Sequence, residues 1–288
     1  MIAAYKSKAP DPNFSEAIVL DKTRASDVER IVSNFQPNVI VDTAALHNVD
    51  YCETHQDEAM TVNRDGTANV ARAASRIKAK FIFISTDFVF DGAGAPYKEE
   101  STPNPLSVYA KSKLGGETAA LTLSENSAVC RPAVIYSWKQ SAKLQTANSS
   151  SGKPLNFGAW LVSQLKGKKE VRIVTDQITS PTLADDLAGA ILAIAENPLA
   201  RGIFHTAGTT ALSRYDFSTQ LARKLGLDEN LIRPVESSVL KQVAKRPINS
   251  SLLSDRIRRE LGYTMMSIDQ ALENFAAAVH GEVLAPEA

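Results

Sequence analysis

Tyr109 and Lys113 stand four positions apart, and Ser85-Thr86-Asp87 ends an apolar run a short distance upstream. An α-helix has about 3.6 residues per turn, so the phenol and the amine would share one face. A free tyrosine has a pKa near ~10, and a neighbouring ammonium lowers that pKa by stabilising the phenolate. The Thr86 hydroxyl would hydrogen-bond the oxygen on which negative charge develops. Together these groups could reduce a carbonyl with a nicotinamide, Tyr109 as proton donor and Lys113 as its activator and a ribose contact.

The same residues also have structural interpretations. A tyrosine four residues before a lysine occurs by chance on charged helices, and a strand-end threonine often only caps a turn. Of the seven tyrosines, however, only Tyr109 has a lysine at this spacing. The Ser-Thr-Asp segment also follows an apparent strand, and open α/β sheets bind ligands at the carboxyl ends of their strands. We therefore expect Thr86, Tyr109 and Lys113 to be catalytic.

The elements that must position these residues alternate along the first half of the chain. Apolar runs separated by stretches of helical periodicity predict an α/β fold with a doubly wound parallel sheet. The expected strands are Val39–Ala45, Lys80–Ile84 and Ala128–Tyr136, and Val39–Ala45 is expected to be buried. The expected helices are Met60–Ile77 and Ser107–Leu123.

Beyond the expected sheet, Ser137–Pro154 is rich in Ser, Lys, Gln and Asn and is predicted to be an exposed loop. Further elements are expected at Val171–Val174 (strand), Leu183–Glu196 (helix) and Ile203–His205 (strand), and the rest of the chain is expected to be mainly helical. We assign residues 1–136 and 183–207 to a dinucleotide-binding core. Residues 137–182 and 208–288 form a smaller, mainly helical substrate-binding part.

The composition describes an ordinary globular protein. With 288 residues, 44% hydrophobic and 22% charged residues and no net charge, the chain shows no attraction for nucleic acid. No apolar run reaches the roughly 20 residues of a membrane helix. Cys52 and Cys130 match no metal-ligand spacing and are interpreted as packing residues. We expect a cytoplasmic protein with no bound metal, and a homodimer remains open.

The motifs resemble a known family. Ser85–Gly92, Tyr109–Lys113 with Gly116-Glu117 behind, Asp176–Thr182 and Arg246-Pro247 come in the order and spacing of the dTDP-4-dehydrorhamnose reductases. These enzymes belong to the extended short-chain dehydrogenase/reductase superfamily. The resemblance implies a Rossmann-like fold and transfer of hydride from NADPH or NADH to the C4 keto group of a dTDP-linked deoxysugar, in dTDP-L-rhamnose biosynthesis.

Carried over by motif, the resemblance implies further site residues. Asp87 and Phe88 would lie beside the sugar, and Arg246 near the nucleotide half of the substrate, although a surface arginine before a turn is an equal interpretation. Ala44 and Ala45 would lie beside the cofactor. Lys6 would meet the 2'-phosphate of NADPH or be a solvated lysine, and Asp21 would contact adenine or be a helix N-cap.

The chain also departs from the family pattern. Phe88 replaces the usual tyrosine, and Asp42 replaces an asparagine, adding a negative charge near the dinucleotide. The first glycine is Gly66, so the glycine-rich turn that holds the cofactor pyrophosphate is missing. Met1–Tyr5 matches the family's second strand, so we expect a Rossmann-like fold whose first βα unit is missing. Either the sequence is truncated or its start codon was assigned too late, which we favour, or the chain has lost that unit.

Three functions remain open at this point. The first is the reductase, or another nucleotide-sugar reductase or epimerase, because the fold alone does not choose the substrate. The second is a non-catalytic partner resembling the regulatory beta subunit of methionine adenosyltransferase. The third is a remnant of the fold with neither role.

Overall fold

A four-stranded parallel sheet lies at the centre of the computed structural model, which describes residues 1–6, 16–138, 156–240 and 242–281. The strand order is β10-β5-β4-β3. The strands are β3 (Val39–Asp42), β4 (Lys80–Ile84), β5 (Ser127–Arg131) and β10 (Gly202–His205). Every residue of β4 and β5 is buried, as in inner strands covered by helices on both faces. The predicted α/β fold with a parallel sheet is confirmed.

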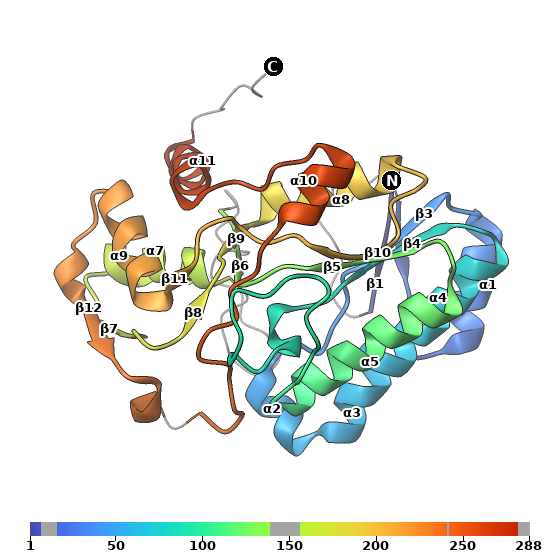
Figure 1. The fold of residues 1–288 in the computed structure, drawn as a ribbon, viewed down its shortest axis with the longest axis horizontal. Helices are drawn as coiled ribbons and strands as arrows, with labels where there is room; N and C mark the ends of the chain where they lie inside the picture. The colour runs from blue at the N-terminus through green and yellow to red at the C-terminus, as the bar shows by residue number, and fades with distance from the viewer. Residues whose placement is uncertain (7–15, 139–155, 241, 282–288) are drawn as a thin grey trace.

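Helices cover both faces of this sheet (Figure 1). On one face α1 (Ala25–Phe35) packs on α4 (Gly66–Arg76), and α4 packs on α5 (Val108–Leu123). On the other face lie α8 (Ala184–Glu196) and α10 (Asp255–Leu261). The expected helix from Met60 begins differently: a π-helical segment, Thr61–Asp65, precedes α4. Short helices α2 (Val49–Thr54) and α3 (Gln56–Met60) lead into it.

The sheet is interrupted beyond β3. β1 (Ile2–Tyr5) and β2 (Glu16–Val19) form a separate parallel pair. Among the described residues no strand pairs with the second edge of β1 or of β3. The expectation that β3 is a buried strand is therefore wrong: Val41 is 40% exposed, because β3 is an edge of the four-stranded sheet.

The other part of the molecule surrounds a second apolar core, which lies on the left in Figure 1. It contains strand pairs as well as the expected helices. The helices are α7 (Phe157–Lys166), α9 (Arg214–Lys224) and α11 (Ile268–His280). The strand pairs are β6 (Ile135–Tyr136) with β9 (Thr182–Leu183), β7 (Val171–Val174) with β12 (Ile232–Val235), and β8 (Ile178–Thr179) with β11 (Leu212–Ser213).

One predicted strand is divided. The expected strand Ala128–Tyr136 ends at Arg131 and resumes at Ile135 as β6, because Pro132 has no N–H to donate and Val134 has a φ of 38°. Short 3₁₀ turns lie at Asp87–Val89, Glu229–Leu231 and Ser237–Leu240. Residues 139–154 of the predicted loop lie outside the described residues. In the parts of the chain that are described, no helix has the length and apolar character to cross a membrane.

Candidate active site

Thr86 and Tyr109 meet at the carboxyl edge of the sheet. Thr86 follows β4, and Tyr109 lies in the first turn of α5, whose N-terminus is capped by Ser107. The Thr86 side chain lies beside the Tyr109 phenol, and its hydroxyl donates to the Asp87 carboxylate over 3.1 Å. The Phe88 ring lies edge-on to the Tyr109 ring, with 6.3 Å between centroids. The structure thus brings together two of the three predicted catalytic groups, with Phe88 beside them.

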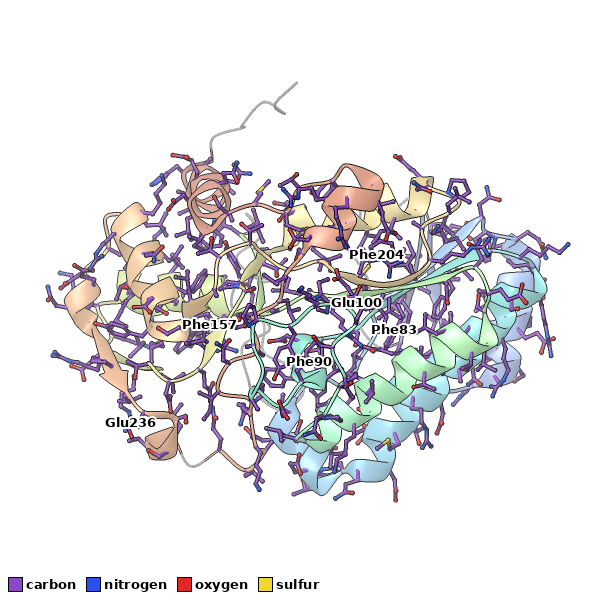
Figure 2. The ribbon with its side chains drawn as sticks, in the orientation of Figure 1. Phe83, Phe90, Glu100, Phe157, Phe204 and Glu236 are labelled. Atoms are coloured by element: carbon purple, nitrogen blue, oxygen red, sulfur yellow. The ribbon has the colours of Figure 1, made fainter. Side chains whose placement is uncertain are left out.

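Lys113 lies one turn further along α5 and is only 2% exposed. Its Nζ donates to the carbonyl of Ile84 over 2.6 Å and lies 4.1 Å from the centroid of the Phe83 ring. Phe83 is labelled in Figure 2, where it points between the sheet and α5. Burial, together with the charge of Lys22, lowers the pKa of Lys113 to about 7, against the opposing charges of Asp42 and Glu117. Lys113 is therefore fixed to the end of the same strand that carries Thr86.

The electrostatics of Tyr109 differ from the expectation. Burial raises the pKa of Tyr109 well above its ordinary value, the charge of Asp87 adds to the rise, and the hydrogen bond with Thr86 opposes it. The Lys113 amine is directed to the Ile84 carbonyl. The predicted lowering of the Tyr109 pKa by Lys113 is thus wrong for this arrangement. A phenol with a raised pKa stays protonated at neutral pH and so can still donate a proton.

Asn63, a fully buried residue of the π-helical segment, fixes the first turn of α5 against the loop after β3. Its amide donates to the carbonyl of Leu46 over 3.0 Å and to the hydroxyl of Ser112 over 2.9 Å. Its carbonyl accepts from the Leu46 N–H over 2.8 Å. The Ser112 hydroxyl in turn donates to the carbonyl of Tyr109. Asn63 therefore orients the turn that carries the phenol.

A buried ion pair anchors α5 to the ends of β4 and β5. The Arg131 guanidinium makes two hydrogen bonds to the carboxylate of Glu117, of 2.9 and 2.6 Å. The two side chains are 1% and 2% exposed, and Ser85 donates its hydroxyl to the same carboxylate. Bidentate geometry of this kind fixes orientation as well as distance. The network therefore sets the position of α5 relative to the strand end that bears Thr86.

Asp87, which the resemblance places beside the sugar, accepts hydrogen bonds from three hydroxyl groups in this structure. Its side chain is buried and accepts hydrogen bonds from the hydroxyls of Thr86, Thr179 and Ser250. Burial raises the pKa of Asp87, while the three hydroxyls oppose the rise. Asp87 therefore ties the Thr86 turn to β8 and to the segment around Ser250.

A cavity of about 490 Å³ opens beside Phe88, and we call it the arginine-lined cavity. Arg246 and Arg214 both line it. Arg246 forms an ion pair of 3.0 Å with Asp50, and Arg214 is the first residue of α9. The Arg214 guanidinium lies 5.2 Å from the centroid of the Phe157 ring, which Figure 2 labels in the left-hand part of the molecule. The cavity is further lined by His47, Trp160, Arg172, Gln177 and Gln242.

A second cavity, of about 270 Å³, lies between β1 and β3, and we call it the β1–β3 cavity. It brings together Lys6, Asp21, Ala44 and Ala45, the residues assigned to the cofactor by resemblance. The ammonium of Lys6 and the carboxylate of Asp21 form an ion pair of 2.9 Å. That pair lowers the pKa of Asp21 to about 2, against the opposing effect of partial burial.

The negative charge expected from Asp42 is neutralised. Lys22 places its Nζ 3.0 and 2.7 Å from the two carboxylate oxygens of Asp42 and donates to the carbonyl of Ala44 over 2.6 Å. Both side chains are buried. The residue that replaces the family asparagine thus adds no net charge beside the β1–β3 cavity.

Comparison with known proteins assigns the family. The model of the RmlD substrate binding domain matches residues 4–280. The chain belongs to this family. It is 33% identical over 276 residues to the dTDP-4-dehydrorhamnose reductase of Aggregatibacter actinomycetemcomitans, covering 92% of this chain and 88% of that one. It is also 33% identical over 256 residues to methionine adenosyltransferase 2 subunit beta of Bos taurus, and the match covers 85% of this chain and 71% of that one.

Solved structures agree with this assignment to the RmlD family. The crystal structure of dTDP-4-dehydrorhamnose reductase from Bacillus anthracis in complex with NADP matches with a TM-score of 0.83 and 27% identity. The match covers 95% of this chain and 97% of that one. The fold is therefore that of the RmlD-type Rossmann reductases.

Sequence reasoning missed Arg214, Lys22 and the precise role of Asp87. Arg214 begins an ordinary surface helix, and its contact with the cavity depends on how α9 packs. Lys22 and Asp42 are 20 residues apart and in different elements. Only a search for opposite charges near the ends of the predicted strands would have predicted the ion pair of Lys22 with Asp42.

Proposed function

We propose that this member of the RmlD family is an NAD(P)-dependent reductase of a keto group on a nucleotide-linked deoxysugar, of the dTDP-4-dehydrorhamnose reductase type. The observation that carries the proposal is the placement of the Tyr109 phenol beside Thr86 and Phe88, with Lys113 one turn further along α5 and the arginine-lined cavity beside Phe88. Acid, second hydroxyl and binding cavity lie together at the carboxyl edge of the sheet, where α/β enzymes bind ligands.

Tyr109 is the proton donor in this proposal. Its phenol, kept protonated by burial, gives a proton to the carbonyl oxygen as the carbonyl carbon accepts a hydride, and the product is an alcohol. Thr86 donates to the same oxygen and so stabilises the charge that develops there. The Asp87 carboxylate fixes the Thr86 turn, and Asn63 and Glu117 fix α5.

The residues that would hold the cofactor fit it in part. A reduced nicotinamide dinucleotide, when bound, supplies the hydride. Lys6, Asp21, Ala44 and Ala45 line a cavity with apolar walls that suits its adenosine end, and Lys113 suits a ribose near Tyr109. Among the described residues, the segment between β1 and α1 offers no glycine-rich turn for the pyrophosphate.

The arginine-lined cavity would hold the substrate. Arg172, Arg214 and Arg246 line the same space, and the Arg214 guanidinium lies over the Phe157 ring. Guanidinium groups suit the oxygens of a diphosphate, and aromatic rings suit the faces of a base or sugar. We assign Arg246 and Arg214 to the diphosphate and Phe88 to the sugar.

The proposal is tested by incubating the chain with NADPH and a dTDP-linked 4-keto-6-deoxysugar and following the loss of nicotinamide absorbance. We expect consumption of NADPH that requires the sugar nucleotide, with a reduced sugar as product. Binding of both molecules without turnover over the whole neutral pH range would contradict the assignment as a reductase.

A second candidate rests on the similarity to methionine adenosyltransferase 2 subunit beta. It is a non-catalytic partner of another enzyme. Tight co-purification with a methionine adenosyltransferase, together with the absence of turnover in the assay above, would favour this candidate.

A further inference from the structure

Arg246, which we assign to the substrate diphosphate, is held by a residue from the other part of the molecule. Its guanidinium forms an ion pair of 3.0 Å with Asp50, the second residue of α2. α2 belongs to the part built on the central sheet, and the segment that carries Arg246 passes beside it (Figure 1). Asp50 therefore connects the two parts next to the arginine-lined cavity.

Asp50 also contacts the backbone of this segment. Its carboxylate accepts the N–H of Ala244 over 3.1 Å, and the Arg246 guanidinium donates to the carbonyl of Ala244 over 3.0 Å. Ala244 itself is buried. The three interactions close a ring through Asp50, Ala244 and Arg246. One carboxylate thus fixes both the backbone of the turn and the direction of the guanidinium.

The start of α2, which carries Asp50, is part of the cavity wall. Asn48 caps α2 by accepting the N–H of Tyr51 over 3.3 Å, and Asn48 and Val49 line the arginine-lined cavity. The side chains of Arg246 and Asp50 are 11% and 21% exposed. Their ion pair is therefore screened less by solvent and salt than a pair on the open surface.

The charges around the cavity explain why Arg246 needs such a partner. Arg172, Arg214 and Arg246 line it, and none of its described lining residues is acidic. Burial lowers the pKa of Arg214, the charge of Asp87 opposes this, and the nearby charge of Arg246 adds to it. Like charges push the guanidinium groups of Arg214 and Arg246 apart, and the Asp50 carboxylate holds Arg246 against that repulsion.

We propose that Asp50 is a positioning residue for the substrate, which holds the Arg246 guanidinium in place to bind the diphosphate of a nucleotide-linked sugar. This inference rests on the proposed function, which assigns Arg246 to the diphosphate. In this role Asp50 acts through Arg246.

The sign of its effect separates positioning from simple electrostatics. A carboxylate near a cationic cavity repels a diphosphate, so its removal should tighten binding if charge alone matters. If Asp50 positions Arg246, its removal should weaken binding, because the freed guanidinium no longer makes a charge-assisted hydrogen bond to the diphosphate.

The test is isothermal titration calorimetry of the full chain with dTDP, which carries the diphosphate but no keto group to be reduced. We expect Asp50→Ala to raise the Kd for dTDP by on the order of tenfold, as for loss of a charged hydrogen bond. Asp50→Asn keeps an acceptor for the Ala244 N–H and loses the charge, so its Kd should lie between those of Asp50→Ala and the wild type.

Asp57→Asn is the matched control. Asp57 lies in the first turn of α3, as Asp50 lies in the first turn of α2, so both variants remove one negative charge from the same position of a short helix. Asp57 is exposed and does not line the arginine-lined cavity. The control should bind dTDP with the wild-type Kd.

A double-variant cycle shows whether Asp50 acts through Arg246. Arg246→Gln should weaken binding by itself, and adding Asp50→Ala to it should raise the Kd no further. Amide hydrogen exchange gives a second measurement that needs no ligand. Exchange at Ala244 should be faster in Asp50→Ala than in the wild type by on the order of tenfold.

Three results would overturn the inference alone, in a chain that binds dTDP. The first is a Kd of Asp50→Ala equal to or lower than that of the wild type. The second is the same loss of affinity with and without Arg246, which would indicate a general structural effect. The third is unchanged exchange at Ala244. If Asp50→Ala fails to fold, Asp50→Asn and its cycle with Arg246→Gln decide in the same way.

Failure of the proposed function gives a different result. A wild-type chain that binds no dTDP would overturn the assignment of Arg246 to the diphosphate, and the inference with it. Binding of dTDP that weakens in Asp50→Ala, and does so through Arg246, supports the inference whatever the rate of turnover.

Discussion

At the scale of single residues, the site depends on how a few polar groups are held. Thr86 lies beside the Tyr109 phenol, and the Asp87 carboxylate accepts the Thr86 hydroxyl and so holds the Thr86 turn in place. Tyr109 and Lys113 share a face of α5 as their spacing predicts, yet the lysine binds a carbonyl and the phenol pKa rises. Spacing along a helix gives direction, whereas the pKa depends on burial, which no short motif encodes.

A residue-scale prediction concerns Arg214. Arg214→Gln removes one of the three arginine side chains that line the arginine-lined cavity, so the KM for the nucleotide sugar should rise on the order of tenfold or more, as for loss of a charged hydrogen bond. kcat should change less. The measurement is steady-state kinetics with varied sugar nucleotide.

Arg223→Gln is the matched control. Arg223 lies on the same helix but pairs with Glu229 on the surface. Equal KM values for the Arg214 variant and the wild type would exclude Arg214 from substrate binding.

At the scale of elements, the helix α5 carries the chemistry and is anchored on two sides. Asn63 fixes its first turn and the Glu117–Arg131 pair fixes its middle. Gly116 allows α5 to pack closely against its neighbours. A Cβ at this position would lie 2.5 Å from the backbone carbonyl oxygen of Asn63 and 2.7 Å from the Phe83 ring. Position 116 therefore requires glycine because of neighbours from other elements.

An element-scale prediction concerns the buried pair. Glu117→Gln leaves the Arg131 guanidinium buried without its counter-charge, and the free energy of unfolding should fall by about 3–5 kcal/mol. Urea denaturation followed by circular dichroism measures this change.

The control is Glu29→Gln, which breaks the exposed Arg76–Glu29 pair and should cost about 1 kcal/mol or less. Similar losses in the two variants would mean that the Glu117 pair is not a buried anchor.

Many of the strands and helices could be predicted from the sequence. The strands Lys80–Ile84 and Val171–Val174 lie where the apolar runs predict them, and α5 begins within one residue of its predicted start. The division at Pro132 and the exposure of β3 were missed. The division depends on Pro132, which lies within an otherwise continuous apolar run. The exposure of β3 depends on which strands are its neighbours, and this is a property of the whole sheet.

At the scale of the whole molecule, two cores meet at the catalytic edge. One packs the central sheet with its helices, and the other joins α7, α9 and α11. Asp87 connects the two parts through Thr179 of β8. Such long-range contacts cannot be predicted from local patterns, so Arg214 and the hydrogen-bond partners of Asp87 had to be found in the structure.

The dependence of global stability on pH should include His205. The ring is fully buried, its Nδ1 faces the Leu253 carbonyl, and burial lowers its pKa to about 3. Between about pH 6.5 and 3 the unfolded chain binds a proton that the folded ring does not. Stability is therefore lost as the pH falls through this window, by about 1.4 kcal/mol per pH unit from this group.

Urea denaturation between pH 7 and 4 checks this contribution. His205→Asn should have a shallower loss of stability than the wild type over that window. Parallel curves for the two proteins would contradict a neutral, buried His205.

The most direct test of the account is the turnover of Tyr109→Phe, with Tyr51→Phe as a control, because Tyr51 is a tyrosine that donates to Glu58 on the surface. Loss of a positioned general acid should lower kcat on the order of 10²–10⁴-fold in the first variant. The second should retain wild-type turnover, and both should keep the wild-type melting temperature within a few degrees. If the Tyr109 variant reduces the sugar nucleotide at the wild-type rate, the proton comes from another group and the central claim is wrong.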